Sequence, residues 1–307
     1  MTYQKGSPIL AADYNTFLTS VNNNYAVGNA DRGYGQTAIS QTAVVAGHPI
    51  LSTQWVNLHD MIVVCGNQQA SNVSSLPPDS ILAVGQIVKA YEQASPSSNP
   101  YELAANVALI DTNRLNFNAP SMTVSTNVWT VTRGSSWTTS IFAEISALWA
   151  SEDAARYYFN SAGQLRLHGA QPGSNHQDIA WNNSLTMGVG LVKFSAHTTT
   201  NTGSFSGSVA KGYYEMTDSY QTIFNATSSG GYYASTETIL IQAKRLNFVG
   251  VHGGNGNGVQ FSITLTDSGM YTSNPVDAGT NFQFDTVRAT TYLSGIAAPT
   301  LATVTNF

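Results

Sequence analysis

The sequence predicts an α+β protein, in which a small N-terminal helical region precedes a predominantly antiparallel β-sandwich with short helical insertions. Two observations predict this class. Apolar residues recur at helical spacing near the N-terminus, and from about residue 124 short apolar and β-branched segments alternate with Gly, Asn and Ser. We therefore place a mainly helical region at residues 1–118 and the β-sandwich at residues 119–307.

An internal repeat defines the helical region. Residues 6–10, Gly-Ser-Pro-Ile-Leu, recur as Gly-His-Pro-Ile-Leu at 47–51, and each copy runs into a short amphipathic segment. The two apolar stripes align position by position, so the helices are expected to pack on each other and to serve in assembly. The residues proposed for that role are Tyr14, Phe17, Val21, Trp55, Leu58 and Ile62. Cys65 continues the second stripe, where we expect a buried, inert thiol.

Other elements follow from local signals. A third helix is expected over residues 80–93 and a further one over 101–113, and the Asp31–Thr37 segment, with its two glycines, predicts an ordered turn. The expected strands are 127–131, 138–148, 164–167, 191–197, 209–214, 238–243, 248–251, 260–266 and 284–292. Short helices or turns are expected over 151–160 and near 178–187 and 218–225.

Residues 151–167 form the most informative stretch, because they predict a complete helix, turn and strand. Ser151 is a suitable N-cap, and the acidic pair Glu152 and Asp153 follows it at the positive end of the helix dipole. Gly163 stands where a left-handed residue would end the helix, and the alternation that follows is typical of a half-buried strand.

The composition narrows the function classes. Charged residues make up only 9% of the 307 residues, whereas hydrophobic residues reach 42%, which argues against disorder. The net charge of -5 provides no footprint for a nucleic acid partner, and no apolar run is long enough to span a membrane. A polar surface that is poor in charge suits β-rich proteins that assemble with copies of themselves.

The segment Ala154–Leu165 resembles one found in uncharacterised virion structural proteins of tailed bacteriophages, including phages of marine cyanobacteria. Further pieces resemble that family in the same order, at residues 11–15, 33–37, 53–62 and 218–224. The resemblance implies a component of the tail, baseplate or fibre apparatus, located in the virion, whose partners are other virion proteins and copies of itself. Tail symmetry in the resembled family favours a trimer or a hexameric ring.

No residue pattern identifies an enzyme, and we expect no catalytic residues, no cofactor and no metal. The glycine-rich segment His252–Gly258 lacks the context of a phosphate-binding loop, so we expect a hairpin there. His176 and Asp178 could share a metal only if His168 or His197 converged on them, and turn or surface positions are the preferred interpretation.

Two alternatives stay open. A receptor-binding module would recognise host surface glycans through aromatic rings beside glycine-rich turns, and the candidates are Tyr213, Tyr214, Tyr232 and Tyr233. A polysaccharide depolymerase would need two carboxylates at a suitable separation, drawn from Glu144, Glu152, Asp153, Glu215, Asp218 and Glu237.

Overall fold

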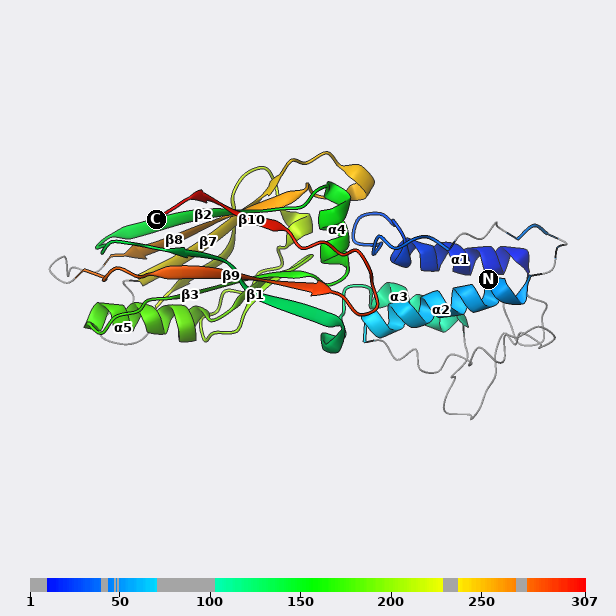
Figure 1. Ribbon diagram of the computed structural model, residues 1–307, viewed down its shortest axis with the longest axis horizontal. Coiled ribbons are helices and arrows are strands. Elements are labelled where there is room, and N and C mark those ends of the chain that lie inside the picture. The colour runs from blue at the N-terminus through cyan, green and yellow to red at the C-terminus, as the bar shows by residue number, and fades with distance from the viewer. Residues whose placement is uncertain are drawn as a thin grey trace. The chain divides into compact units, whose positions relative to one another are not determined.

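The computed structural model describes residues 10–39, 44–46, 48, 50–70, 103–228, 237–268 and 275–307 (Figure 1). These residues form five α-helices and two five-stranded antiparallel sheets. The predicted α+β class with a predominance of β structure is therefore confirmed. The expected helix at 80–93 lies outside the described residues, as do Tyr232 and Tyr233.

The chain divides into two compact units. Unit 1 comprises residues 1–122 together with 289–296, and unit 2 comprises residues 123–288 together with 297–307. The return of residues 289–296 to unit 1 has no local signal in the sequence. Gln36 holds this segment, because its side chain donates to the Ser294 carbonyl at 2.9 Å and accepts from the Ser294 N–H at 3.0 Å. Leu293 and Ile296 are buried.

Three helices make up the described core of unit 1: α1 (Ala11–Tyr25), α2 (Ser52–Gln68) and α3 (Leu103–Thr112). The sequence repeat has a structural counterpart, because α1 and α2 begin directly after the repeated Leu10 and Leu51. The aligned residues Tyr14 and Trp55 contact each other edge to face at 5.2 Å between ring centroids. Each of the three helices packs against the other two, so the expected helical hairpin is a three-helix arrangement.

The Asp31–Thr37 segment is ordered around a buried tyrosine. Gly33 and Gly35 have φ angles of 94° and 69°, which glycine adopts without strain. Tyr34, between them, donates its hydroxyl to the Arg114 carbonyl at 2.7 Å. In α2, Cys65 is buried as expected, and burial raises the pKa of its thiol to about 12.

Unit 2 is a sandwich of two sheets. The first has the order β1 (Met122–Thr132), β9 (Asn281–Ala289), β3 (Gln164–Ala170), β4 (Val192–Phe194) and β5 (Thr199–Asn201). The second has the order β10 (Thr300–Thr305), β2 (Ser140–Leu148), β8 (Gly258–Asp267), β7 (Glu237–Leu246) and β6 (Gln221–Thr227). Phe261 of β8 packs against Phe194 of β4 and Phe284 of β9 at 5.2 and 5.3 Å, so the sheets meet face to face.

Helix α4 (Glu152–Asn160) has the expected start, because the Ser151 hydroxyl accepts from the Ala154 N–H at 3.1 Å. Its end differs from the prediction. The left-handed residue is Ala162, with a φ of 64°, and the N–H groups of Ala162 and Gly163 bond back to the carbonyls of Phe159 and Tyr158. Gly163 is needed for space, because a Cβ there would lie 2.4 Å from the Tyr158 carbonyl oxygen.

Three predicted elements are wrong. Residues 218–225, expected as a helix or turn, contain β6, whose register shift between Thr222 and Phe224 disrupts the alternating pattern. Residues 209–214 form only a bridge at Val209 and a 3-10 helix at Tyr213–Glu215. Residues 248–251 belong to the loop between β7 and β8, where the Arg245 guanidinium covers the Phe248 ring at 3.6 Å. Neither β5 nor β10 was predicted.

Helix α5 (His176–Asn183) continues into a π-helical turn at Ser184–Val189, close to the expected 178–187 segment. Trp181 anchors it, since its ring is fully buried and lies 5.1 Å from the ring of Trp137. In the part of the chain that the structure describes, no helix is both long and apolar enough to cross a bilayer.

Candidate functional site

The side chains proposed for assembly through the N-terminal helices are buried inside unit 1. Each of the six is at most 3% exposed: Tyr14, Phe17, Val21, Trp55, Leu58 and Ile62. They stabilise the unit to which they belong and are not accessible to another chain. Contacts between copies must therefore use other side chains.

Tyr213 is not the exposed ring that glycan stacking requires, which corrects the sequence-based proposal for this residue. It is fully buried, stacks on Phe159 at 4.6 Å and donates its hydroxyl to the Gly256 carbonyl at 2.7 Å. Tyr214 is half-buried. Its ring stacks on His197 at 5.1 Å, and its hydroxyl donates to Asn160 at 2.7 Å.

The carboxylates considered for glycan cleavage have separate structural partners. Glu144 accepts from Tyr220 and from Thr305, and Glu215 accepts from the Gly212 N–H at 2.8 Å while it contacts His197 at 2.6 Å. Asp153 pairs with Arg156, and Asp218 with Arg245. Glu152 and Glu237 are buried and are treated below.

The histidines considered as metal ligands lie in different surroundings. His168 is 3.6 Å from Asp285, and His197 contacts Glu215. Asp178 is fully buried, not a surface residue as expected, and accepts from the Gln171 amide and the Asp277 N–H at 3.0 and 2.9 Å. Burial raises the pKa of Asp178, and the neighbouring Asp277 carboxyl adds to this effect although backbone donors oppose it. Within the described ranges, no group of three or more His, Cys, Asp or Glu side chains has metal-binding geometry.

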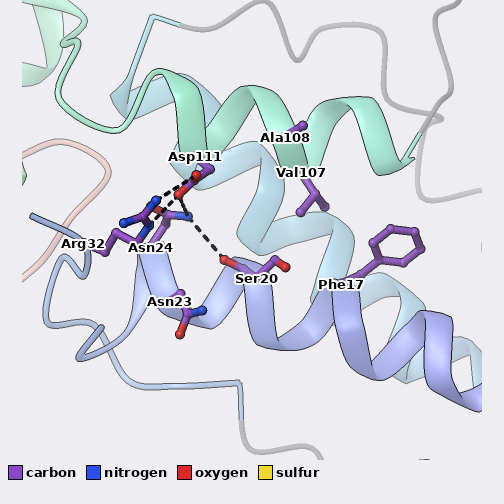
Figure 2. A pocket seen from close by; sticks show the side chains of 8 residues that line it. All are labelled: Phe17, Ser20, Asn23, Asn24, Arg32, Val107, Ala108 and Asp111. Carbon is purple, nitrogen blue, oxygen red and sulfur yellow. Dashed lines mark hydrogen bonds and ion pairs between the residues drawn. The ribbon is translucent and has the colours of Figure 1, made fainter. Parts of the chain in front are cut away.

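Figure 2 shows a pocket of about 530 Å³ in unit 1, between α1 and α3. At one end, Arg32 donates to both carboxylate oxygens of Asp111, at 2.7 and 3.1 Å, and the Asn24 amide reaches the same carboxylate. The opposite charges of Arg32 and Asp111 compensate each other, so neither is offered alone to a ligand. The pocket is also lined by Phe17, Ser20, Asn23, Val107 and Ala108.

The most distinctive accessible surface is formed by two edge strands of the sandwich. β1 and β10 are the outermost strands of their respective sheets, and no described strand pairs with their outer sides. The indole of Trp129 on β1 donates to the Thr303 hydroxyl on β10 at 3.0 Å. This bond places both strands at the same side of the sandwich, and we refer to β1 and β10 together as the uncharged edge.

The uncharged edge lacks the usual protection against pairing with other chains. The sequence has no Asp, Glu, Lys or Arg between Arg114 and Arg133, and none after Arg288. Val124, Val128 and Val304 on these strands are 45%, 45% and 51% exposed. Edge strands are commonly protected by charged side chains, above all lysine, or by proline, and an exposed apolar edge is a template for strand addition.

Each edge strand is regular on both sides of one irregularity. In β1, Asn127 has a φ of 52° and donates its N–H to Asp285 at 2.8 Å, and in β10 the register shifts between Thr303 and Thr305. Such irregularities end a pairing run locally. Residues 128–132 and 300–303 are left as the segments able to accept another strand.

Sequence reasoning missed this surface, although a signal was present. The β1 sequence, Met-Thr-Val-Ser-Thr-Asn-Val-Trp-Thr-Val-Thr, combines β-branched residues with a complete lack of charge. Searches with family models, among curated proteins and among solved structures found nothing that matches this chain.

Proposed function

We propose that this chain is a structural component of a bacteriophage virion, from the tail, baseplate or fibre apparatus, and that its copies associate through the uncharged edge. It acts by protein–protein contact and not as an enzyme. The observation that carries the proposal is the pair of exposed, charge-free edge strands on one side of the sandwich. The resemblance to phage virion proteins supports the location.

A second copy of the chain is the occupant that the charges favour. The chain has a net charge of -5, so two copies repel each other at long range. A contact made through β1 and β10 brings no side-chain charges of like sign together. It also satisfies main-chain donors and acceptors that no described strand pairs, as in other cases of strand addition.

The stoichiometry separates two ways of pairing. If β1 of one copy pairs with β1 of another, the contact is isologous and gives a dimer. If β1 of one copy pairs with β10 of the next, the contact is heterologous and can close into a ring. A trimer or a hexameric ring, which we propose, therefore needs the second arrangement.

Light scattering coupled to size-exclusion chromatography, over a range of protein concentrations, tests the assembly. Val128→Lys and Val304→Lys place a charge on the uncharged edge and should weaken association at least about tenfold. Thr200→Lys is the matched control, since Thr200 is also an exposed strand residue but lies on β5, in which it should leave association unchanged. A monomeric wild-type protein, or equal losses in all three variants, contradicts assembly through this edge.

The location is tested separately. Mass spectrometry and antibody labelling of purified phage particles should detect the chain, and labelling should place it on the tail apparatus. Particles that lack the chain would exclude a virion role whatever the oligomeric state of the isolated protein.

Host-glycan recognition is the second candidate, supported by one observation. Tyr214 presents a half-buried ring beside the polar side chains of His197 and Glu215, a combination suited to a sugar face. Binding on a glycan array should then be lost in Tyr214→Ala and kept in Tyr292→Ala, which alters an exposed tyrosine in unit 1. An array without signal for the wild-type protein eliminates this candidate.

A further inference from the structure

Two buried carboxylates face each other at the end of the β7–β8 hairpin. Glu237 is the first residue of β7 and Asp267 the last of β8, and they are direct partners in the antiparallel register. Their side chains are only 1% and 6% exposed. Cross-strand partners have Cβ atoms about 5 Å apart, so two negative charges share one poorly solvated site. Such a pair is costly unless a cation or a proton neutralises it.

The donors that α5 and its π-helical turn supply to this pair are neutral. Ser184 donates its hydroxyl to Glu237, and the Gln177 amide donates to Asp267. The indole N–H of Trp181 points at the same Asp267 oxygen from 3.5 Å. These contacts orient the carboxylates without cancelling their charge.

Two oxygen atoms at the site lack a hydrogen-bond donor. Oε1 of Glu237 and Oε1 of Gln177 are both buried, and no donor reaches either of them. Because the Gln177 nitrogen is committed to Asp267, its oxygen stays beside the acidic pair. Buried acceptors without a partner are rare in folded proteins, so each calls for a positive or hydrogen-bonding group.

We propose that Glu237, Asp267 and Gln177 bind a divalent cation, calcium in preference to magnesium. Hard oxygen ligands, two of them carboxylates and one an amide carbonyl, are the set that calcium prefers. Calcium accepts six to eight oxygens in flexible geometry, whereas magnesium demands a near-ideal octahedron that these side chains do not provide. The proposal is independent of the virion role.

A proton is the competing occupant. Burial, with a smaller contribution from the Asp267 charge, raises the pKa of Glu237 to about 7 although the Ser184 hydrogen bond opposes the change. A proton on Glu237 would satisfy one carboxylate oxygen and leave Oε1 of Gln177 without a partner. A cation reaches both of these oxygens, and this is why we prefer it.

Terbium luminescence tests the site directly, because Tb³⁺ replaces Ca²⁺ and is excited by a nearby indole. Trp181 lies beside Asp267, so wild-type protein titrated with Tb³⁺ should show saturable sensitised emission that Ca²⁺ abolishes by competition. Glu237→Gln and Asp267→Asn should each lose most of the emission. Glu144→Gln is the matched control, since it removes a carboxylate that Tyr220 and Thr305 hold on β2.

A second readout guards against loss of folding in the variants. Calcium should raise the melting temperature of wild-type protein by about 5 °C when present at about 100 times its dissociation constant. Trp181→Phe should keep that rise while it loses the terbium emission. Wild-type protein that gives no sensitised emission and melts at the same temperature in calcium and in chelator would overturn the proposal and leave the proton as the occupant.

Discussion

Glu152 accepts a hydrogen bond from the backbone N–H of Gly256 at 2.7 Å, across 104 residues of sequence. Its second oxygen accepts from the Val251 N–H at 2.8 Å. The glycine-rich loop that could have been mistaken for a phosphate cradle therefore surrounds an anion supplied by the chain itself. The carboxylate is buried and lies at the first turn of α4, so one side chain joins the helix to the β7–β8 loop.

Removal of this carboxylate should destabilise unit 2. Glu152→Ala leaves two loop N–H groups without an acceptor, at a cost of about 2 to 4 kcal/mol, and Glu152→Gln should cost less because one oxygen remains. Urea denaturation measures both. Asp218→Asn, which alters an exposed ion pair with Arg245, should change stability by less than about 1 kcal/mol. Equal effects of Glu152→Ala and Asp218→Asn would show that the loop contacts contribute little.

The end of α4 predicts opposite responses at adjacent positions. Gly163→Ala should destabilise the protein by about 2 kcal/mol or more, because the new Cβ would overlap the Tyr158 carbonyl and ring. Ala162→Gly should be neutral or stabilising by up to about 1 kcal/mol, since glycine adopts the left-handed conformation without strain. Thermal denaturation of the two variants tests this order, and a larger loss in Ala162→Gly would contradict it.

The ion pair at the pocket in unit 1 predicts a dependence of stability on pH. The hydrogen bond from Arg32 lowers the pKa of Asp111 despite partial burial, with help from Asn24. The stabilisation is present above the unfolded pKa of about 3.9 and is lost as the pH falls through the lowered folded value. Asp111→Asn should therefore cost about 1 kcal/mol or less near neutral pH, since both side chains are partly exposed, and nothing in strong acid.

Denaturation of wild-type protein and Asp111→Asn across the acid range measures this difference. Arg32→Gln should produce a similar loss, and the double variant should lose little more than either single variant. A difference that persists unchanged below pH 3 or so would assign the effect to packing instead of charge.

Local features of the sequence were enough to predict α4 and β3. The Ser151 cap, the acidic first turn and the alternation from Leu165 to Leu167 all lie within one short stretch, so nothing distant was needed. The repeat likewise predicted the starts of α1 and α2. Ala162 was missed because the general preference for glycine at helix ends gave no warning of a close contact with Tyr158.

Features that depend on distant parts of the chain could not be predicted. Tyr213 stands beside a glycine, as an exposed ring might, but Phe159 covers it from 54 residues away. β10 becomes a strand by pairing with β2, which ends about 150 residues earlier, and its short sequence carries no stronger signal than a loop. The meeting of Glu237 with Asp267 depends in the same way on the register of β7 and β8.

The return of residues 289–296 to unit 1 restricts how the protein can be taken apart. The polypeptide passes between the units three times, after residues 122, 288 and 296. A fragment cut after residue 122 would lack Leu293, Ile296 and the backbone that Gln36 binds, and a fragment that begins at residue 123 would carry those apolar side chains without their intended surroundings. Dissection by truncation is thus a poor guide to which half does what, and point substitutions in the intact chain are the sounder tool.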